Sequence, residues 1–284
     1  MAQAALRGLE VPVIEVDSRR WRPSVAHLVE VWSYREVLLA FAVRYFKVKY
    51  KQAFIGVGWS VVQPILASLL FSLFMGRFAK LPSEGLPYFV FCLGGMVAWS
   101  FFSTAVANSG ESLIRDQGLV RKVYFPREAL PLATVLASLA DLPAALGVFL
   151  VVSLLFGIPI SITWLLLPIP IVLLILCATG LGFVISALNV YYRDIRYVLP
   201  FLLQLLLFAS PVFYSIRLVP DKWRFLYGTL NPVATAIEDF RRVVLHGGMI
   251  DPGRNLAAFG ISLALLLIGY YTFKSLERGF ADHL

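Results

Sequence analysis

The chain has 284 residues, of which 59% are hydrophobic and only 15% are charged, whereas about 25% are charged in an ordinary soluble domain. With a mean hydropathy of +0.79, it has too few polar side chains to cover a folded surface in water. Composition therefore excludes a soluble protein and predicts an all-α integral membrane protein. The net charge of +8 does not indicate a nucleic-acid partner, because basic residues beside membrane spans set orientation and contact anionic lipids.

The N-terminal part divides into a tail and a helix. Residues 1–30 are polar and lack the apolar core of a secretory signal, so we expect a cytoplasmic tail. Residues 31–53 are predicted to be an amphipathic helix, with apolar side chains recurring every three or four positions and with Arg44, Lys47 and Lys51 on another face. Such a helix lies in the membrane interface, where these cations would contact lipid headgroups or the pyrophosphate of a substrate. The alternatives are simple anchoring and a buried helix of a small cytoplasmic domain.

The remaining residues, 54–284, are predicted to form one domain of six transmembrane helices. Each expected span is long and apolar enough to cross the hydrocarbon core, which takes about 20 residues of helix. The third span exceeds this minimum, and Pro131 and Pro143 predict kinks in it. The expected spans are residues 56–75, 86–106, 129–156, 164–191, 197–214 and 256–273.

The distribution of basic residues predicts the orientation of these spans. An even number of spans places both termini on the same side of the membrane. The N-terminal segment, the loops at 110–128 and 192–196, and the C-terminal tail together carry 17 of the 25 Lys and Arg residues. By the positive-inside rule, we expect a multi-pass protein of the cell membrane with both termini in the cytoplasm.

The last external loop, residues 215–255, is too long for a simple connection. Asn231-Pro232 marks a turn, and the following segment has a helical pattern with Val233, Ile237 and Phe240 on one face. Short apolar helices just before a final span predict re-entrant segments, which survive in the membrane only when buried in protein or lining an aqueous path. We predict that these three residues belong to an external gate; the alternative is a cap that only packs on the spans.

The chain lacks the residues of a phosphate-binding loop. Lys274 is its one lysine followed by Ser or Thr, and Phe273 precedes it instead of Gly. We therefore expect no ATP hydrolysis, no catalytic residues and no cofactor on this chain. Cys92 and Cys177 lie inside apolar runs away from histidines, so no metal site is expected either.

One alternative to transport is a membrane-embedded glycosyl- or acyltransferase. Its catalytic set would have to assemble from Glu238, Asp239 and His246 in the long external loop, because the other two histidines are far from any carboxylate cluster. We give this less weight, since charges on a loop helix are more often solvated or structural.

Asp141 is a carboxylate within a predicted span, where insertion costs about 2.5–3.5 kcal/mol. It either contacts a polar substrate in an aqueous path, pairs with a basic or hydroxyl side chain of a neighbouring helix, or lies at a water-filled rim beside Pro143. We favour a structural role, because no second ionisable group accompanies it in the spans.

Several motifs resemble those of the membrane subunits of type-2 ABC exporters for polysaccharides. Residues 44–56 read RYFKVKYKQAFIG and precede Trp59 and Pro64, like the segment that opens the first span in that family. Similar motifs are KVYFPRE at 122–128, NVYYRDI at 189–195, and Asn231-Pro232 with Phe240-Arg241. The resemblance covers residues 30–274.

The resemblance implies a permease that exports O-antigen, capsular polysaccharide or teichoic acid on a lipid carrier across a bacterial cell membrane. Two identical copies would bind two ATP-binding subunits, which would carry ATP and Mg²⁺. A type-2 ABC exporter of a lipid or drug shares the same plan and remains the nearer alternative. The coupling element to the ATPase would be residues 111–124 and the start of the next helix, with charged residues at Glu111, Arg115, Asp116, Arg121, Lys122 and Arg127.

Overall fold

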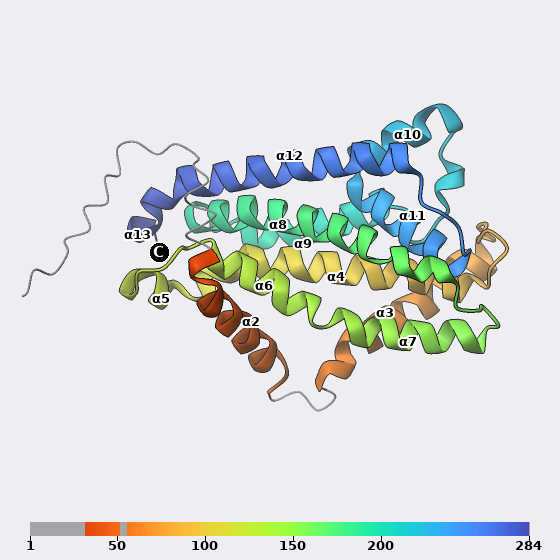
Figure 1. Cartoon of the computed structure of the whole chain (residues 1–284), viewed down its shortest axis with the longest axis horizontal. Helices are drawn as coiled ribbons and strands as arrows, with labels where there is room; N and C mark the ends of the chain where they lie inside the picture. The colour runs from red at the N-terminus through yellow and green to blue at the C-terminus, as the bar shows by residue number, and fades with distance from the viewer. Residues whose placement is uncertain (1–31, 52–55, 284) are drawn as a thin grey trace, which may run out of the picture.

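The computed structural model describes residues 32–51 and 56–283, which form a helical bundle (Figure 1). Within these residues there are no strands, and five helical stretches are long and apolar enough to cross a membrane. The all-α membrane class is therefore confirmed. The predicted tail at residues 1–30 lies outside the described residues.

The long helices are arranged in chain order as follows, with short 3-10 (η1, η3, η4, η5) and π (η2) turns between them. They are α2 (Arg35–Tyr50), η1 (Gly56–Gly58), α3 (Trp59–Phe71), η2 (Ser72–Phe78), α4 (Tyr88–Arg115), α5 (Gln117–Lys122), α6 (Ala129–Leu139), α7 (Leu142–Leu155), η3 (Ile162–Leu166), α8 (Pro168–Tyr191), α9 (Ile195–Ala209), η4 (Ile216–Leu218), α10 (Asp221–Leu230), α11 (Pro232–Leu245), α12 (Pro252–Leu276), η5 (Glu277–Gly279) and α13 (Phe280–His283).

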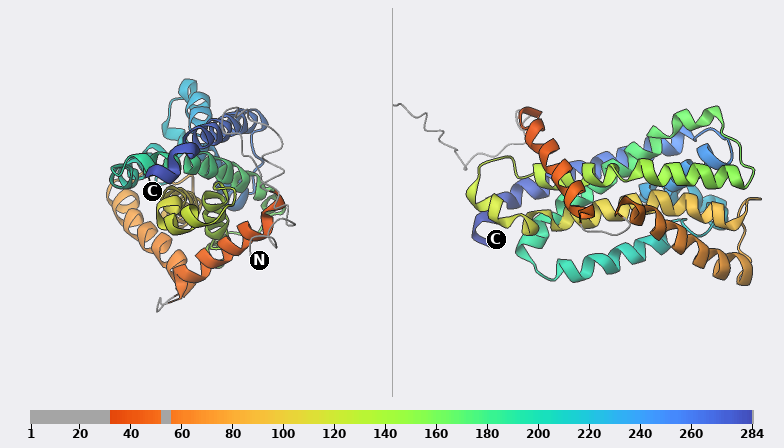
Figure 2. Two further views of the ribbon diagram at one scale, coloured as in Figure 1. Left: turned by 90° about the vertical axis from the view of Figure 1, so that its left-hand side faces the viewer. Right: turned by 90° about the horizontal axis from the view of Figure 1, so that it is seen from below.

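The bundle has two distinct ends (Figure 1). At one end, called the α5 end, lie α5 and α13; at the other, called the α10 end, lie α10 and the loop at 79–87. Helices α4 and α8 form the centre, and α11 lies against both. Helix α2 instead crosses the outside of the bundle near the α5 end (Figure 2).

The expected spans agree with these helices except at two places. Helix α4 continues to Arg115, nine residues beyond its predicted end, so the predicted loop at 110–128 begins with helix. The predicted span at 197–214 is the shorter helix α9, which ends at Ala209. It stops there because Ser210 precedes Pro211, and the residue before a proline is disfavoured in the helical region; Ser210 is extended, with ψ 149°.

The third span is interrupted as Pro143 predicts. The helix breaks between α6 and α7, and Pro143 lies in the first turn of α7, where its missing N–H is not needed. Pro131 produces no kink, because it lies in the first turn of α6 and no earlier turn is available to donate to. The break leaves Asp141 between two helices.

The predicted amphipathic helix is found as α2. Tyr34, Leu38, Phe41 and Tyr45 form its inner face and pack against a cluster of apolar side chains from α4, α5 and α6 that includes Phe125. The face that the sequence pattern marks as apolar is therefore the one that contacts the protein.

Helices α8 and α12 pack closely at two glycines. A β-carbon at Gly269 would lie 2.2 Å from the backbone oxygen of Gly180, closer than any atoms can approach. Small residues at such a crossing let two helices in lipid gain contact along their backbones. The glycines therefore set the distance between the centre of the bundle and its last span.

Replacing Gly269 with alanine should force α8 and α12 apart and destabilise the protein by about 1–3 kcal/mol, the usual cost of overpacking. The thermal midpoint of the detergent-purified protein measures this. Gly260→Ala is the matched control, because it lies on the same helix with nothing within 4 Å of the new β-carbon. Its effect should be neutral or slightly stabilising; equal midpoints for the two variants would contradict the close crossing.

Candidate functional site

Two carboxylates hold α2 against the bundle. Asp116, between α4 and α5, accepts hydrogen bonds from the guanidinium of Arg44 and from the Tyr45 hydroxyl at 2.5 Å. Asp141, at the break between α6 and α7, accepts from Lys49 Nζ at 2.5 Å and from the Tyr50 hydroxyl at 2.8 Å. Both carboxylates are largely buried, so each charge is matched by a cation and a hydroxyl of α2.

The local sequence explains this double attachment. The pairs Arg44-Tyr45 and Lys49-Tyr50 have the same chemistry and are five residues apart. In a helix this spacing separates the pairs by about 7.5 Å along the axis. One α2 face therefore reaches both the end of α4 and the break in the third span.

The protonation states follow from the same contacts. Burial alone would lower the pKa of Lys49, but hydrogen bonds and charge interactions with Asp141 and Tyr50 outweigh it and raise this pKa above its ordinary value. Burial and the hydrogen bond to Asp116 raise the pKa of Tyr45. Lys49 is thus a cation at neutral pH, and the neutral Tyr45 hydroxyl donates to Asp116.

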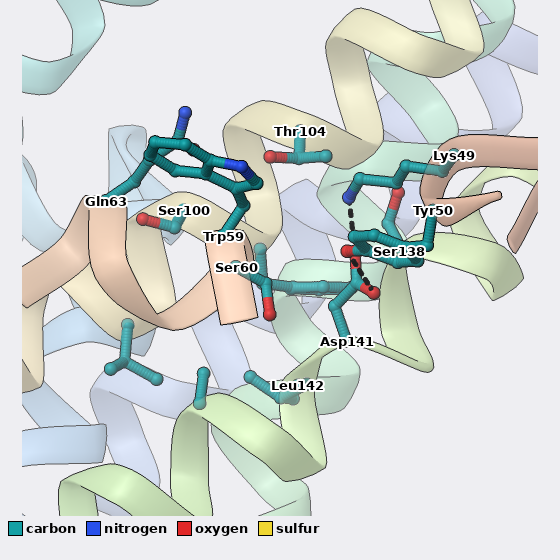
Figure 3. A pocket seen from close by; sticks show the side chains of 13 residues that line it. Lys49, Tyr50, Trp59, Ser60, Gln63, Ser100, Thr104, Ser138, Asp141 and Leu142 are labelled. Carbon is teal, nitrogen blue, oxygen red and sulfur yellow. Dashed lines mark hydrogen bonds and ion pairs between the residues drawn. The ribbon is translucent and has the colours of Figure 1, made fainter. Parts of the chain in front are cut away.

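A cavity of about 180 Å³ lies beside the second attachment, between α2, α3, α4 and the α6–α7 break (Figure 3). We call it the Trp59 cavity. Trp59, Tyr50 and Phe101 supply rings, and its polar side chains are Lys49, Ser60, Gln63, Ser100, Thr104, Ser138 and Asp141. Aromatic faces combined with hydroxyl and amide groups are suited to a ligand that is apolar on one face and hydrogen-bonding at its edge.

A second cavity, of about 440 Å³, lies beside the first attachment. Its wall includes Arg44, Tyr45, Asn108 and Asp116, and it shares Lys49 and Ser138 with the Trp59 cavity. The two cavities therefore follow each other beneath α2. The helix that carries the cations also covers this polar path.

The predicted gate residues lie in the apolar core. Val233, Ile237 and Phe240 are at most 3% exposed, and they pack with residues of α4 and α8 in the main apolar cluster. Helix α11 thus dips into the bundle from the α10 end, as a re-entrant helix does. Helix α10 lies outside, with Gly228 as its one buried residue.

Arg241 secures α11 within the bundle. Its guanidinium donates to the backbone oxygens of Phe91 (3.1 Å), Pro211 (2.6 Å) and Val212, and it lies 3.8 Å from the centre of the Phe91 ring. These carbonyls are free because the chain is irregular after α9. A fully buried arginine therefore joins three segments, and we did not predict it.

The predicted coupling residues separate into two groups. Glu111, Arg121 and Lys122 are exposed at the α5 end. Asp116 and Arg127 are instead engaged inside the protein: Asp116 anchors α2, and Arg127 donates to the backbone oxygen of Glu277 at 2.8 Å. Arg115 lies 3.8 Å from Asp116 and over the ring of Tyr45.

The substrate-contact cations of α2 also differ from one another. Arg44 is engaged with Asp116, whereas Lys47 and Lys51 lie on the exposed side of the helix. For Asp141, pairing with a basic side chain of a neighbouring helix, which we favoured, is what the structure shows. Its partner Lys49 was missed, although the repeated basic-tyrosine pair was a usable signal.

The possible transferase residues do not form a catalytic set. Asp239 pairs with Arg254 at 2.8 Å, Glu238 lies 3.6 Å from Arg242, and His246 lies 3.5 Å from Glu84. Each acid therefore has a separate basic partner. In the part of the chain that the structure describes, no group of three or more His, Cys, Asp or Glu residues is placed to bind a metal.

Comparison with known proteins identifies the class. The family model for ABC-2 type transporters matches residues 36–245, and the chain belongs to that family. It is therefore a membrane-embedded transport subunit and not an enzyme.

Individual relatives are similar over most of their length. The O-antigen export system permease protein RfbA of Myxococcus xanthus is 26% identical over 256 residues, covering 90% of this chain and 98% of the relative. The protein of the same name from Klebsiella pneumoniae is 24% identical and covers 88% of this chain and 95% of the relative. The polysialic acid transport protein KpsM of Escherichia coli is also 24% identical, over 84% and 93%.

The attachment of α2 can be tested with Lys49→Gln, Asp141→Asn and the double variant. Each single change should loosen α2, and the second should add little, giving a coupling energy of about 1 kcal/mol because Lys49 is partly exposed. Thermal midpoints and the rate of proteolytic cleavage in α2 measure this. Lys47→Gln on the exposed side is the control, and strictly additive effects would argue against the pair.

Proposed function

We propose that this chain is the permease subunit of an ATP-driven exporter that moves a lipid-linked polysaccharide out of the cytoplasm across the bacterial inner membrane. The observation that carries the proposal is the Trp59 cavity, where rings and hydrogen-bonding side chains line one path beneath α2. Sugar rings have apolar faces and polar edges, so this lining suits them. The names of the relatives point to the same cargo class.

The α5 end faces the cytoplasm in this proposal, and both termini lie there. Most Lys and Arg residues outside the spans are on segments that lead to this end. The outer surface of α5, with Arg121 and Lys122, is then the docking site for a separate ATP-binding subunit that carries ATP and Mg²⁺. Because Asp116 directly precedes α5 and anchors α2, the docking site is joined to the cover of the polar path.

A second copy of the chain completes the path. Helix α3 and helix α9 lie on one side of the bundle, where Phe71 stacks on Phe213 with ring centres 3.5 Å apart (Figure 2). Helix α9 buries Leu199 alone, and α3 buries Pro64 and Ser68. These largely apolar faces suit contact with a partner copy, so that the polymer passes between two halves.

The outer face of α2 suits a lipid-linked substrate. Leu39, Val43 and Val48 are more than half exposed, and Lys47 and Lys51 lie beside them. An apolar strip next to cations matches a lipid chain that ends in a phosphate group. The substrate would thus reach the path along α2 from the cytoplasmic leaflet.

Export in cells tests the function. Cells lacking this chain should retain the polysaccharide inside, and Arg121→Glu with Lys122→Glu should restore little export, because reversed charge prevents ATPase docking. The complex purified with its ATP-binding subunit should have the mass of two copies of each. Lys222→Glu on exposed α10, at the other end, is the matched control.

Normal polysaccharide export without the chain would contradict the cargo and leave a lipid or drug as the transported molecule. Unchanged co-purification of the ATPase with the Arg121 and Lys122 variant would instead contradict the docking site alone.

Gating at α11 can be tested with single cysteines at Val233, Ile237 or Phe240, in a background with Cys92 and Cys177 replaced. The three positions are buried, so an impermeant external thiol reagent should modify them slowly at rest and faster during ATP-driven export. A cysteine at exposed Trp223 is the control and should react at the same rate in both states. Identical slow rates at rest and during turnover would reduce α11 to a structural element.

A further inference from the structure

A polar chamber of about 210 Å³ lies at the α10 end, separate from the cavities beneath α2. This volume equals that of about seven molecules of liquid water. Its walls come from the loop before α4, from η4, α10 and α11, and from the start of α12. Segments that are far apart in the sequence thus converge on one small space.

The walls of the chamber carry an excess of positive charge. Five guanidiniums line it, and they belong to Arg217, Arg224, Arg241, Arg242 and Arg254. The carboxylates of the lining are Glu84 and Glu238. Outside the lining, Asp239 pairs with Arg254, and the exposed Asp221 pairs with Arg224 at 2.7 Å. The arginines outnumber the acids even when these two are included, and His246 lines the chamber as well.

Arg241 contributes most to this imbalance. It is 1% exposed, and its hydrogen-bond acceptors are neutral backbone oxygens. No carboxylate within the described residues forms an ion pair with it. A buried cation without a directly paired anion is costly, and a nearby anion lowers that cost.

Two arginine N–H groups of the lining have no acceptor. The Nε atoms of Arg254 and Arg224 are buried, and neither has a hydrogen-bond partner within the described residues. The whole Arg254 residue is only 5% exposed. Buried donors of this kind are usually satisfied by a bound molecule, and arginine forks match the geometry of an oxyanion.

Glu84 is held in an unfavourable backbone conformation at the chamber. Its φ is +58°, which costs an ordinary residue about 1–2 kcal/mol. Ser215 donates to its carboxylate, and His246 and Arg217 lie within 3.8 Å of it. Strain of this kind is concentrated at binding sites, where the surroundings fix a side chain in place.

We propose that this chamber is an oxyanion site on the outer side of the permease, which binds the phosphate or carboxylate of a small ligand between Arg217, Arg242 and Arg254. The exposed Arg217 side chain, 70% accessible, is at its mouth, and Arg254 is at its base. The site is next to the gate helix α11. It does not rest on the proposed cargo, because its occupancy is measurable without transport.

The test uses the purified full chain in phosphatidylcholine nanodiscs, titrated calorimetrically with inorganic phosphate in a phosphate-free buffer. The unaltered protein should bind phosphate, and Arg217→Gln with Arg242→Gln should weaken binding at least about tenfold, or 1.4 kcal/mol. Both residues are accessible, so the buried pairs stay intact. Lys222→Gln, nearby on α10 but outside the chamber, should bind like the unaltered chain.

A second variant separates binding from damage to the fold. Glu84→Gln keeps an acceptor for Ser215 but removes a negative charge, so it should tighten phosphate binding, whereas a collapsed chamber would weaken it. Absence of phosphate binding, or equal binding by the unaltered and the Arg217 and Arg242 proteins, would overturn the proposal.

Two further titrations identify the source of the oxyanion. Competition by glucuronate but not glucose would support the site with an acidic sugar as ligand. Competition by phosphatidylglycerol in the nanodisc would support it with a lipid headgroup as ligand.

Discussion

A carboxylate at a break in a membrane-embedded helix needs a cation, and the rest of the candidate site depends on how this need is met at Asp141. The nearby spans offer no basic side chain, so Lys49 of α2 supplies it. Asp116 repeats the arrangement with Arg44 at the start of α5. Since both pairs lie on one helix, α2 has one position and covers the cavities below it. Neutralising either acid would remove the charge but also the reason for α2 to lie there.

The same electrostatic rule organises the two ends of the bundle. Near the α5 end, Lys274 of α12 pairs with Glu128 at 2.7 Å, which joins the last span to the start of α6. Near the α10 end, Asp239 pairs with Arg254, which joins α11 to α12. Between these ends the contacts are apolar or involve small residues such as Gly180 and Gly269. Charge pairs therefore fix the ends, while close packing fixes the middle.

Much of this architecture could be predicted from the sequence, because span length and periodicity are local properties. The break at Pro143 and the inner face of α2 follow from proline chemistry and from helical spacing. The partner of Asp141 and the burial of Arg241 could not be predicted in this way, since they depend on which helices meet. Arg241 is the clearest case: its acceptors are carbonyls of residues 91 and 211–214, which no pattern in α11 indicates.

The position of Asp116 gives α2 a further consequence within the proposed function. Asp116 is the residue directly before α5, so a displacement of α5 by an ATPase moves the carboxylate that holds Arg44 and Tyr45. Helix α2 is rigid over the five residues to Lys49, and the same displacement therefore loads the Asp141 pair at the wall of the Trp59 cavity. Coupling through two ion pairs on one helix needs no change in the buried core of α4 and α8. It also explains why the anchors of α2 are charge pairs, which can separate and re-form in a partly hydrated cavity, and not interlocked apolar side chains.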